Sequence, residues 1–341
     1  MRRITLLNCL LGLLTLGPAT RGLADGVAPP QRPILPQCRV LEGLVGTWDT
    51  QLSSGSAEVL GKPRPIGRTT RQWVADHKFV HERGNEHEAY ITFDPPQNMY
   101  RAWYFHSNGH VWTMAGQWTG NMTMLSLSAE MDQNQSMQRH FQVLDDKSHE
   151  CTVAWTDEDG RNGTYGIFNY TRCDPASVAN TGKASASIQP KPTPSAEMQI
   201  FADDIGKWTV EGSVTNGETT TKVNGSSVVQ WILGGRFVQT TTKLQGREGE
   251  GIGIAGYDTA TKTYRCWFFD AGGIYSEPGL GVWDEKTRTM AWKQQMTSDI
   301  AMVSKKQWIN HDIAKSHAVF TRQNGAIETT RDVTITRQKD K

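Results

Sequence analysis

The sequence predicts an all-β protein made of two tandem antiparallel β-barrels of about ten strands each. The second half of the chain repeats the first at an offset of about 160 residues, which indicates domain duplication. Within each copy, apolar residues alternate with polar ones, and turn residues interrupt the pattern about every 8 to 12 positions. A length of 341 residues also suits two domains of about 150 residues each. A pair of β-sandwiches is the alternative architecture.

The start of the chain has the pattern of a secretory signal peptide over residues 1–24. Arg2 and Arg3 supply the positive start, an apolar run follows, and Gly22-Leu23-Ala24 is a small-x-small cleavage site. We therefore expect export to the periplasm or the extracellular space. The apolar run is shorter than the roughly 18 residues that span a bilayer, and no later stretch is longer, so we expect no membrane span.

Composition divides the rest of the chain. Residues 25–37 are rich in proline and are expected to form an extended lead-in. Residues 174–195 are rich in Ala, Ser, Thr and Pro, which cannot bury enough apolar surface to fold, and are expected to form a flexible linker. This leaves residues 38–173 for the first barrel and 196–339 for the second.

The matched motifs of the two copies occur in the same order and at similar spacing. They pair Gly46-Thr47-Trp48 with Gly206-Lys207-Trp208, Gln72-Trp73 with Gln230-Trp231, Phe79-Val80 with Phe237-Val238, Tyr100-Arg101-Ala102-Trp103 with Tyr264-Arg265-Cys266-Trp267, Gly116-Gln117-Trp118 with Gly281-Val282-Trp283, and Tyr170-Thr171-Arg172 with Ile335-Thr336-Arg337. The similarity therefore covers each domain from its first strand to its last.

Short helices are expected only just before each barrel. The spacing of apolar residues predicts them over 39–45 and 196–205, with Ser195 placed to cap the second. The alternating pattern predicts strands elsewhere, for example in the first copy over 89–94, 99–105, 111–117 and 137–144.

A tryptophan in the first strand and an arginine at the end of the last strand recur in both copies, as Trp48 with Arg172 and Trp208 with Arg337. Closing a barrel makes those two strands neighbours. The guanidinium can then stack on the indole, a contact worth about 1 kcal/mol. We expect both pairs to be structural.

Four cysteines follow the predicted signal peptide, and export permits disulfides. Cys38 precedes the first strand of copy one and Cys173 follows its last strand, so closure predicts a Cys38–Cys173 bond. Cys38–Cys151 is the alternative. Cys266 aligns with Ala102 and is expected to be a small buried apolar residue.

The motifs of the second copy resemble a known family. They are the Gly-x-Trp at 206–208, the Trp-x-x-Gly-Gly-Arg-Phe at 231–237, the Gly-Tyr-Asp at 256–258 and the Tyr-x-x-Trp at 264–267. Together they resemble an uncharacterised bacterial domain-of-unknown-function family, number fifteen seventy-nine, here as a tandem pair. The first copy departs from the pattern, with Asp76-His77-Lys78 and Thr92-Phe93-Asp94 in place of two of these motifs.

Gly-x-Trp with a terminal arginine is also similar to the calycin group, which includes lipocalins, fatty-acid-binding proteins and haem-binding nitrobindins. That resemblance implies a ten-stranded barrel with a cup at one end. It implies nothing definite about function, because one fold serves many functions.

Aromatic and histidine side chains are the candidates for lining such a cup, because small-molecule sites are concave and mostly apolar. Both faces of the strand over 99–105 are apolar, so the sequence leaves open which face points inward. The candidates are Trp103, Trp118, His81 and His106 in the first copy and Tyr257, Trp267 and Trp283 in the second.

The first copy holds seven of the nine histidines, which raises the hypothesis of a metal or haem site there. The histidines form no His-x-x-x-His pair on a helix and no close Cys/His cluster. Neither His149 nor His317 has a histidine opposite it in the other copy, as a shared axial ligand would require. We therefore expect surface and turn histidines and no metal site.

Charge and motifs narrow the function. The net charge is +1 and the basic residues are scattered among acidic ones, which argues against nucleic-acid binding. No Gly-x-Ser-x-Gly elbow and no phosphate-binding glycine loop before a helix stands out. We expect non-catalytic binding of a small apolar or flat molecule in a barrel cup. The alternatives are an enzyme with its site in a cup and an envelope interaction module without a ligand.

Overall fold

A computed structural model describes residues 36–54, 63–119, 123–130, 135–173, 192–247 and 249–339. The described strands form two closed antiparallel barrels of ten strands each, so the predicted fold class is confirmed and the sandwich alternative is wrong. The predicted signal peptide lies outside the described residues, as do nearly all of the lead-in and most of the linker. None of the described helices is long and apolar enough to cross a membrane.

The first barrel closes through pairing of its first strand with its last. The strands predicted by way of example over 89–94, 99–105, 111–117 and 137–144 all match observed strands to within two residues at each end. The ten strands are β1 (Gly46–Ser54), β2 (Arg64–Val74), β3 (Phe79–Arg83), β4 (His87–Asp94), β5 (Met99–His106), β6 (Val111–Thr119), β7 (Met124–Glu130), β8 (Ser136–Val143), β9 (Ser148–Thr156) and β10 (Asn162–Arg172).

The second barrel has the same strand order, and β11 pairs with β20 to close it. Its strands are β11 (Gly206–Asn216), β12 (Thr219–Ile232), β13 (Phe237–Leu244), β14 (Gly251–Asp258), β15 (Thr263–Asp270), β16 (Gly279–Asp284), β17 (Thr289–Gln295), β18 (Ile300–Trp308), β19 (Ile313–Arg322) and β20 (Ile327–Arg337).

Short helices cover one end of each barrel. The first is α1 (Pro36–Arg39) continued by η3 (Val40–Leu44), and the second is η5 (Glu197–Asp204); a further turn, η6 (Leu233–Gly235), links β12 to β13. The expected Ser195 cap is wrong, because Ala196 occupies the cap position of η5 and no side chain caps it.

The same two contacts fasten each helix to its barrel. The indole N–H of Trp48 donates to the carbonyl oxygen of Leu44, and that of Trp208 donates to the carbonyl oxygen of Asp204. Arg172 and Arg337 lie over these indole rings, each with its guanidinium carbon 4.2 Å from the ring centroid. The stacking predicted from the repeat is therefore present in both copies.

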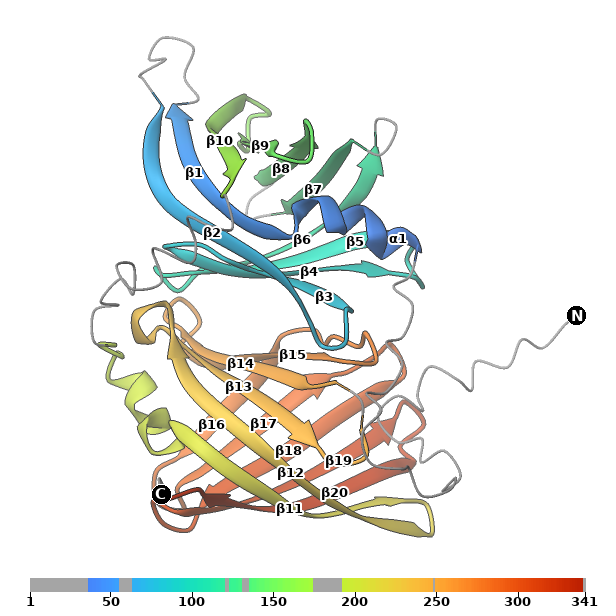
Figure 1. The fold of residues 1–341 in the computed structure, drawn as a ribbon. Helices are drawn as coiled ribbons and strands as arrows, with labels where there is room; N and C mark the ends of the chain where they lie inside the picture. Colours follow the sequence, from blue (N-terminus) through green and yellow to red (C-terminus); the bar gives the residue numbers. More distant parts are fainter. Residues whose placement is uncertain are drawn as a thin grey trace, which may run out of the picture.

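The two barrels pack against each other through a cluster of buried aromatic side chains (Figure 1). In Figure 1, β3, β4 and β5 form the lower side of the first barrel, and β13, β14 and β15 form the upper side of the second. The aromatic members are Phe79, Tyr90, Trp103 and Phe105 from the first barrel and Phe237, Trp267 and Phe269 from the second. This contact buries outward faces that would otherwise be in water.

The aromatic contacts come in pairs related by exchange of the two barrels. Ring centroids are 5.4 Å apart in Phe79–Phe269 and in Phe105–Phe237, and 5.1 and 5.0 Å apart in Trp103–Phe269 and Phe105–Trp267. The repeat aligns Phe79 with Phe237, Trp103 with Trp267 and Phe105 with Phe269, so exchange of the barrels turns each contact into its counterpart. The barrels thus meet with the pseudo-two-fold symmetry of a homodimer.

The predicted Cys38–Cys173 bond is absent, and so is the alternative with Cys151, because all four described cysteines are free. Helix α1 carries Cys38 across the barrel end to β4. Cys173 instead lies beside Asp49 at the closing strands β1 and β10. Barrel closure brings β1 and β10 together, but this helix places Cys38 away from them.

Candidate functional site

The lumen-facing positions follow from alternation along each strand. On β3, Val80 and Glu82 face the lumen of the first barrel, whereas Phe79 and His81 face outward. The registers carry this phase around both barrels, because directly opposed residues of paired strands point to the same side. Aligned positions of the two lumens can therefore be compared.

The second lumen is lined by smaller side chains than the first. Equivalent positions in the repeat, taken from matched motifs and strand registers, change from Arg71 to Val229, Glu82 to Thr240, Ala89 to Gly253, Tyr104 to Phe268, Met114 to Gly279, Arg139 to Ser304, Cys151 to Ser316 and Phe168 to Val333. The changes from Leu127 to Trp292, Ala129 to Gln294 and Gly166 to Arg331 run the other way. These substitutions together remove volume from the middle of the second lumen.

The contacts inside the second barrel agree with an open interior. A methyl group added at Gly253 would meet nothing closer than the Cβ atom of Thr240, at 3.9 Å. Trp231, Phe268 and Trp292 face the lumen and yet are only partly buried. The walls of this cup are thus aromatic rings separated by glycine, serine and threonine.

One cation in this cup has no described partner. Arg331 on β20 faces the lumen between Val214 and Ala318, and its Nε atom is buried without a hydrogen bond. Burial, and then repulsion from Arg247, lowers the pKa of Arg331 below its usual value. Next to it lies an apolar cluster of Met296, Ile300, Ala318 and Phe320, with Phe268 and Met302 packed against it.

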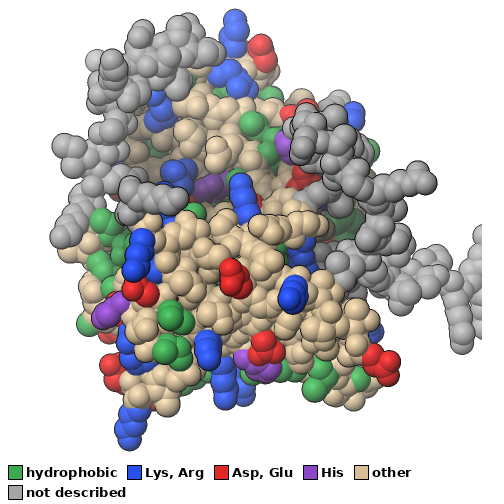
Figure 2. All heavy atoms as spheres, turned by 60° about the horizontal axis from the view of Figure 1, so that its bottom comes forward, with side chains coloured by type: hydrophobic (Ala, Val, Ile, Leu, Met, Phe, Trp, Pro, Cys, Tyr) green, Lys and Arg blue, Asp and Glu red, His purple; other side chains and the backbone are tan. Residues whose placement is uncertain are grey.

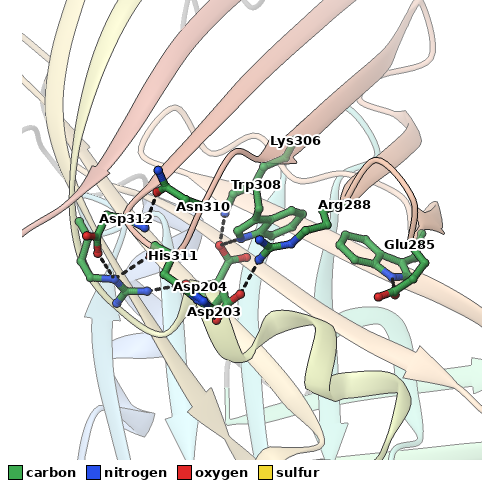
Figure 3. A network of polar contacts seen from close by, with 11 residues as sticks. Asp203, Asp204, Glu285, Arg288, Lys306, Trp308, Asn310, His311 and Asp312 are labelled. Atoms are coloured by element: carbon green, nitrogen blue, oxygen red, sulfur yellow. Dashed lines mark hydrogen bonds and ion pairs between the residues drawn. The ribbon is translucent and has the colours of Figure 1, made fainter.

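The closed end of the same barrel is occupied by a polar network (Figure 3). One carboxylate oxygen of Asp204 accepts hydrogen bonds from Lys306 at 2.5 Å and from the Trp308 indole at 2.9 Å. Asp203 accepts from Arg288 at 2.6 Å and lies 2.8 Å from His311. Since both aspartates belong to η5, this network holds the helix over the barrel end rather than forming a binding site.

The first lumen contains a buried charged cluster. Arg71 donates to Glu82 at 2.5 Å, and its Nη1 atom lies 2.7 Å from Nε2 of His149. His87 lies 2.5 Å from the other oxygen of Glu82. Burial acts to raise the pKa of Glu82, but Arg71 and His87 outweigh it and hold that pKa well below its usual range.

A second arginine in this lumen has a ring contact but no described ionic partner. The guanidinium carbon of Arg139 lies 4.1 Å from the ring centroid of Tyr104 and 5.9 Å from that of Phe141. Its Nε and Nη1 atoms are buried without hydrogen bonds, as is the hydroxyl of Tyr104. Arg71 lies over the same Phe141 ring at 5.7 Å, so the two cations approach one residue.

The structure separates the predicted cup residues into two groups. Trp118 and His106 face the first lumen, and Tyr257 and Trp283 face the second. Trp103 and Trp267 lie instead in the contact between the barrels, and His81 faces outward, paired with Glu88 at 2.8 Å. Their expected place in a cup is therefore corrected, because strand alternation puts them on the opposite face.

Sequence reasoning missed the lumen arginines. A usable signal was present, because Arg71, Glu82 and Arg139 replace small or uncharged residues at aligned positions of the second copy. Charged residues that occur in only one copy, at positions that face the lumen, indicate that the interior of that barrel is specialised. The described residues contain no group of three or more His, Cys, Asp or Glu side chains placed to hold a metal ion.

The outer surface of the second barrel carries a groove of about 790 Å³. It crosses β16 to β20 and β11 and is lined by exposed side chains of both charges, among them Lys305, Lys315 and Asp332. Figure 2, turned to bring the lower side of Figure 1 forward, shows mostly backbone and uncharged polar side chains, with charged side chains of both signs and hydrophobic side chains scattered between them. A charged patch for a polyanion is not seen on this face.

Among protein families, the match covers only the second half of the chain. Residues 193–326, which are the second barrel and its helix, match the family described as Protein of unknown function (DUF1579). No curated protein matches. Among solved structures, the chain is similar to an S-type phycobiliprotein lyase from Guillardia theta, with 13% identity, a TM-score of 0.33, and coverage of 42% of this chain and 93% of that chain.

Two further structures are similar. Rv2717c from M. tuberculosis is 11% identical with a TM-score of 0.36, over 43% of this chain and 100% of that chain. A protein of unknown function from Nostoc punctiforme is 12% identical with a TM-score of 0.31, over 89% of this chain and 100% of that chain. Nothing about the ligand or activity of this chain follows from these likenesses.

Proposed function

We propose that the second barrel binds a small, flat or apolar molecule in its lumen and that Arg331 holds an acidic group of that molecule. The observation that carries the proposal is the loss of side-chain volume at aligned lumen positions, from Arg139 to Ser304 and from Glu82 to Thr240 for example. Protein interiors are close-packed, so a lumen lined by glycine and serine is open unless a guest fills it.

The chemistry of the walls favours a flat guest. Partly buried Trp231, Trp292 and Phe268 offer ring faces, which gain contact area from planar molecules. Thr240, Ser304 and Ser316 add hydroxyl groups that can orient the guest by hydrogen bonds. The cup is thus mostly apolar with few polar groups, as small-molecule sites usually are.

The acidic group follows from the charge. An unpaired guanidinium inside a barrel is costly, and a ligand carboxylate or sulfonate would offset that cost by a charge-assisted hydrogen bond. The depressed pKa of Arg331, caused first by burial, is the electrostatic sign of that unpaired state. The neighbouring apolar cluster around Phe320 would accept the body of the same molecule.

The test uses the fluorescent probe 8-anilinonaphthalene-1-sulfonate, which combines flat rings with one sulfonate. We expect saturable binding to the full chain. Gly253→Leu should fill the lumen and abolish the binding, and Arg331→Gln should weaken it about tenfold or more, equivalent to about 1.4 kcal/mol.

Matched controls make the same chemical changes on the outside. Ser226→Leu and Lys305→Gln alter exposed outward-facing positions of the same barrel and should leave the affinity unchanged. Probe binding that is equal in all four variants would place the probe outside the lumen and contradict the proposal. A wild-type chain that does not bind the probe would favour the alternative of an interaction module without a ligand.

We also infer that the first barrel is a diverged copy of the same domain and that the chain is exported. The shared strand order, the paired Trp–Arg contacts and the aligned motifs support the common origin. The charged start, apolar run and small-x-small site support export. Intact mass of the protein from a cell envelope fraction should correspond to a mature chain that begins at Asp25; an uncleaved chain in the cytoplasm would contradict export.

A further inference from the structure

The buried charges of the first lumen do not balance. Arg71, Arg139 and Glu82 are all less than 5% exposed, and they give two positive charges against one negative charge. Arg71 pairs directly with Glu82, whereas Arg139 has no carboxylate within ion-pair distance among the residues that the structure describes. Buried charges in proteins are normally paired, so this lumen lacks one negative charge.

The orphaned hydrogen-bonding groups lie around the same place. They include Nε and Nη1 of Arg139, Nη2 of Arg71 and the hydroxyl of Tyr104, all buried and without partners. Tyr104 stacks on Arg139, and the two arginines share Phe141 as a ring neighbour. Native structures rarely leave several buried donors without hydrogen bonds. Four such donors in one lumen indicate a missing acceptor that they would share.

The geometry of the guanidinium selects the kind of acceptor. An aromatic ring covers a face of the Arg139 guanidinium, so its N–H groups point out along the edge. A planar carboxylate matches such an edge, because its two oxygens can accept two parallel hydrogen bonds.

From these observations we propose that the first barrel holds a second and separate binding site, in which Arg139, Arg71 and Tyr104 bind a small monovalent carboxylate. One negative charge makes the cluster neutral. His149 adds no positive charge at neutral pH, since burial, and then Arg71, lowers its pKa to about 2. The described walls at this level are almost wholly buried, which limits the ligand at the arginines to a few atoms.

The carboxylate can be a free small acid or the head of a longer one. Above the cluster, Trp112, Met137 and Phe168 face the open end of the lumen and are only partly buried. An apolar chain could lie along them. Comparison of acetate with octanoate separates the two sources: tighter binding of octanoate identifies a head group, and equal binding identifies a free small acid.

The experiment measures thermal unfolding of the full chain in sodium acetate, with sodium chloride at the same ionic strength as the reference. A ligand that binds only the folded state raises the melting temperature, by about 5 °C or more at roughly one hundred times its Kd. We expect a saturable rise with acetate. Titration of ¹³C-labelled acetate followed by NMR should give the same Kd.

Arg139→Met is the critical variant. It keeps the length of the side chain and leaves the neutral Arg71–Glu82 pair, so we expect the variant to be folded and at least as stable in chloride. It should lose the acetate response. Arg139→Lys keeps the charge but not the paired N–H edge, and should weaken acetate at least tenfold. Arg161→Gln, at a turn arginine with a 72% exposed side chain, is the matched control.

The proposal is overturned if acetate and chloride act alike on the wild-type chain, or if Arg139→Met responds to acetate as the wild-type chain does. The ¹³C titration tests the wild-type chain directly, even if Arg139→Met does not fold. Arg331→Gln in the second barrel should leave the part of the acetate response that depends on Arg139 intact, so failure here is distinguishable from failure of the proposed cup.

Discussion

The terminal arginine of each barrel joins three separate segments. Arg337 stacks on Trp208 and donates hydrogen bonds to the carbonyl oxygens of Ile205, Asp203 and His311, from Nη1, Nη2 and Nε respectively. A glycine precedes each tryptophan by two positions for the same reason. A Cβ atom at Gly206 would lie 2.7 Å from Nη1 of Arg337, and the φ of +137° there is one that other residues rarely adopt.

We predict that Arg337→Met lowers the unfolding free energy of the second barrel by about 2–4 kcal/mol. The change removes a cation–π contact worth about 1 kcal/mol and three hydrogen bonds worth about 1 kcal/mol each, reduced because the side chain is partly exposed. Urea unfolding followed by tryptophan fluorescence measures it. Arg322→Met, at the distant end of β19, is the control and should cost less than about 1 kcal/mol. If Arg337→Met and Arg322→Met lower the unfolding free energy equally, Arg337 does not have the structural role described here.

One buried and one partly buried histidine predict sensitivity of the first barrel to mild acid. Burial is the main cause that lowers the pKa of His149 to about 2 and that of His106 to about 3, from a usual value of 6.5. Below about pH 6.5 the unfolded chain therefore binds protons that the folded chain does not. Stability should fall as the pH drops, by about 1.4 kcal/mol per pH unit for each histidine.

Urea unfolding at pH 7.5 and pH 5.5 tests this, with His149→Gln and the outward-facing His140→Gln compared. The first change should reduce the loss of stability between the two pH values by about half, and the second should not. Stability that is the same at both pH values would show that these histidines become protonated without unfolding.

At the scale of strands, alternation predicted where the elements lie but not which face turns inward. The predicted strands over 89–94 and 99–105 match β4 and β5 closely. The reason is that successive side chains of a strand point to opposite faces, and this gives the sequence its period of two. Both faces of β5 are buried, one in the lumen with Tyr104 and the other against the second barrel with Trp103. Local sequence carries no signal that distinguishes a core from an interface of equal apolarity.

The same limit explains the candidate site. The tryptophan content predicts Trp103 and Trp267 as cup residues. Both copies have a tryptophan at this position because each barrel uses it in the contact between the barrels. The binding chemistry that we propose lies where the copies differ, at Arg139 against Ser304 and at Arg331 against Gly166. Assigning those positions requires strand registers, which depend on barrel closure and bulges and cannot be read from one sequence.

At the scale of the molecule, duplication and the interface have one explanation. A single barrel with Phe237, Trp267 and Phe269 on its outer face would expose a large apolar patch, and such patches mark association sites. Two copies that meet through the same face bury it with two-fold symmetry. Fusion of two such copies in one chain would then allow the lumens to diverge, since only the outer face would have to stay complementary.

This explanation predicts that the second barrel alone, expressed as residues 192–341, forms a dimer through the face that the first barrel covers. The contacts can be rebuilt: Phe237 would meet Phe269 of the other copy as Phe79 now does. Asp258 occupies the aligned position of Asp94, which accepts a 2.5 Å hydrogen bond from Tyr275, so that bond could form twice.

Sedimentation equilibrium should give a dimer for the isolated barrel. Phe269→Asp should yield a monomer that remains folded, because this side chain lies outside the lumen, while Val282→Asp on the exposed outer face should leave the dimer intact. A monomeric isolated barrel, or an aggregate without a defined stoichiometry, would contradict descent of the interface from a symmetric pair.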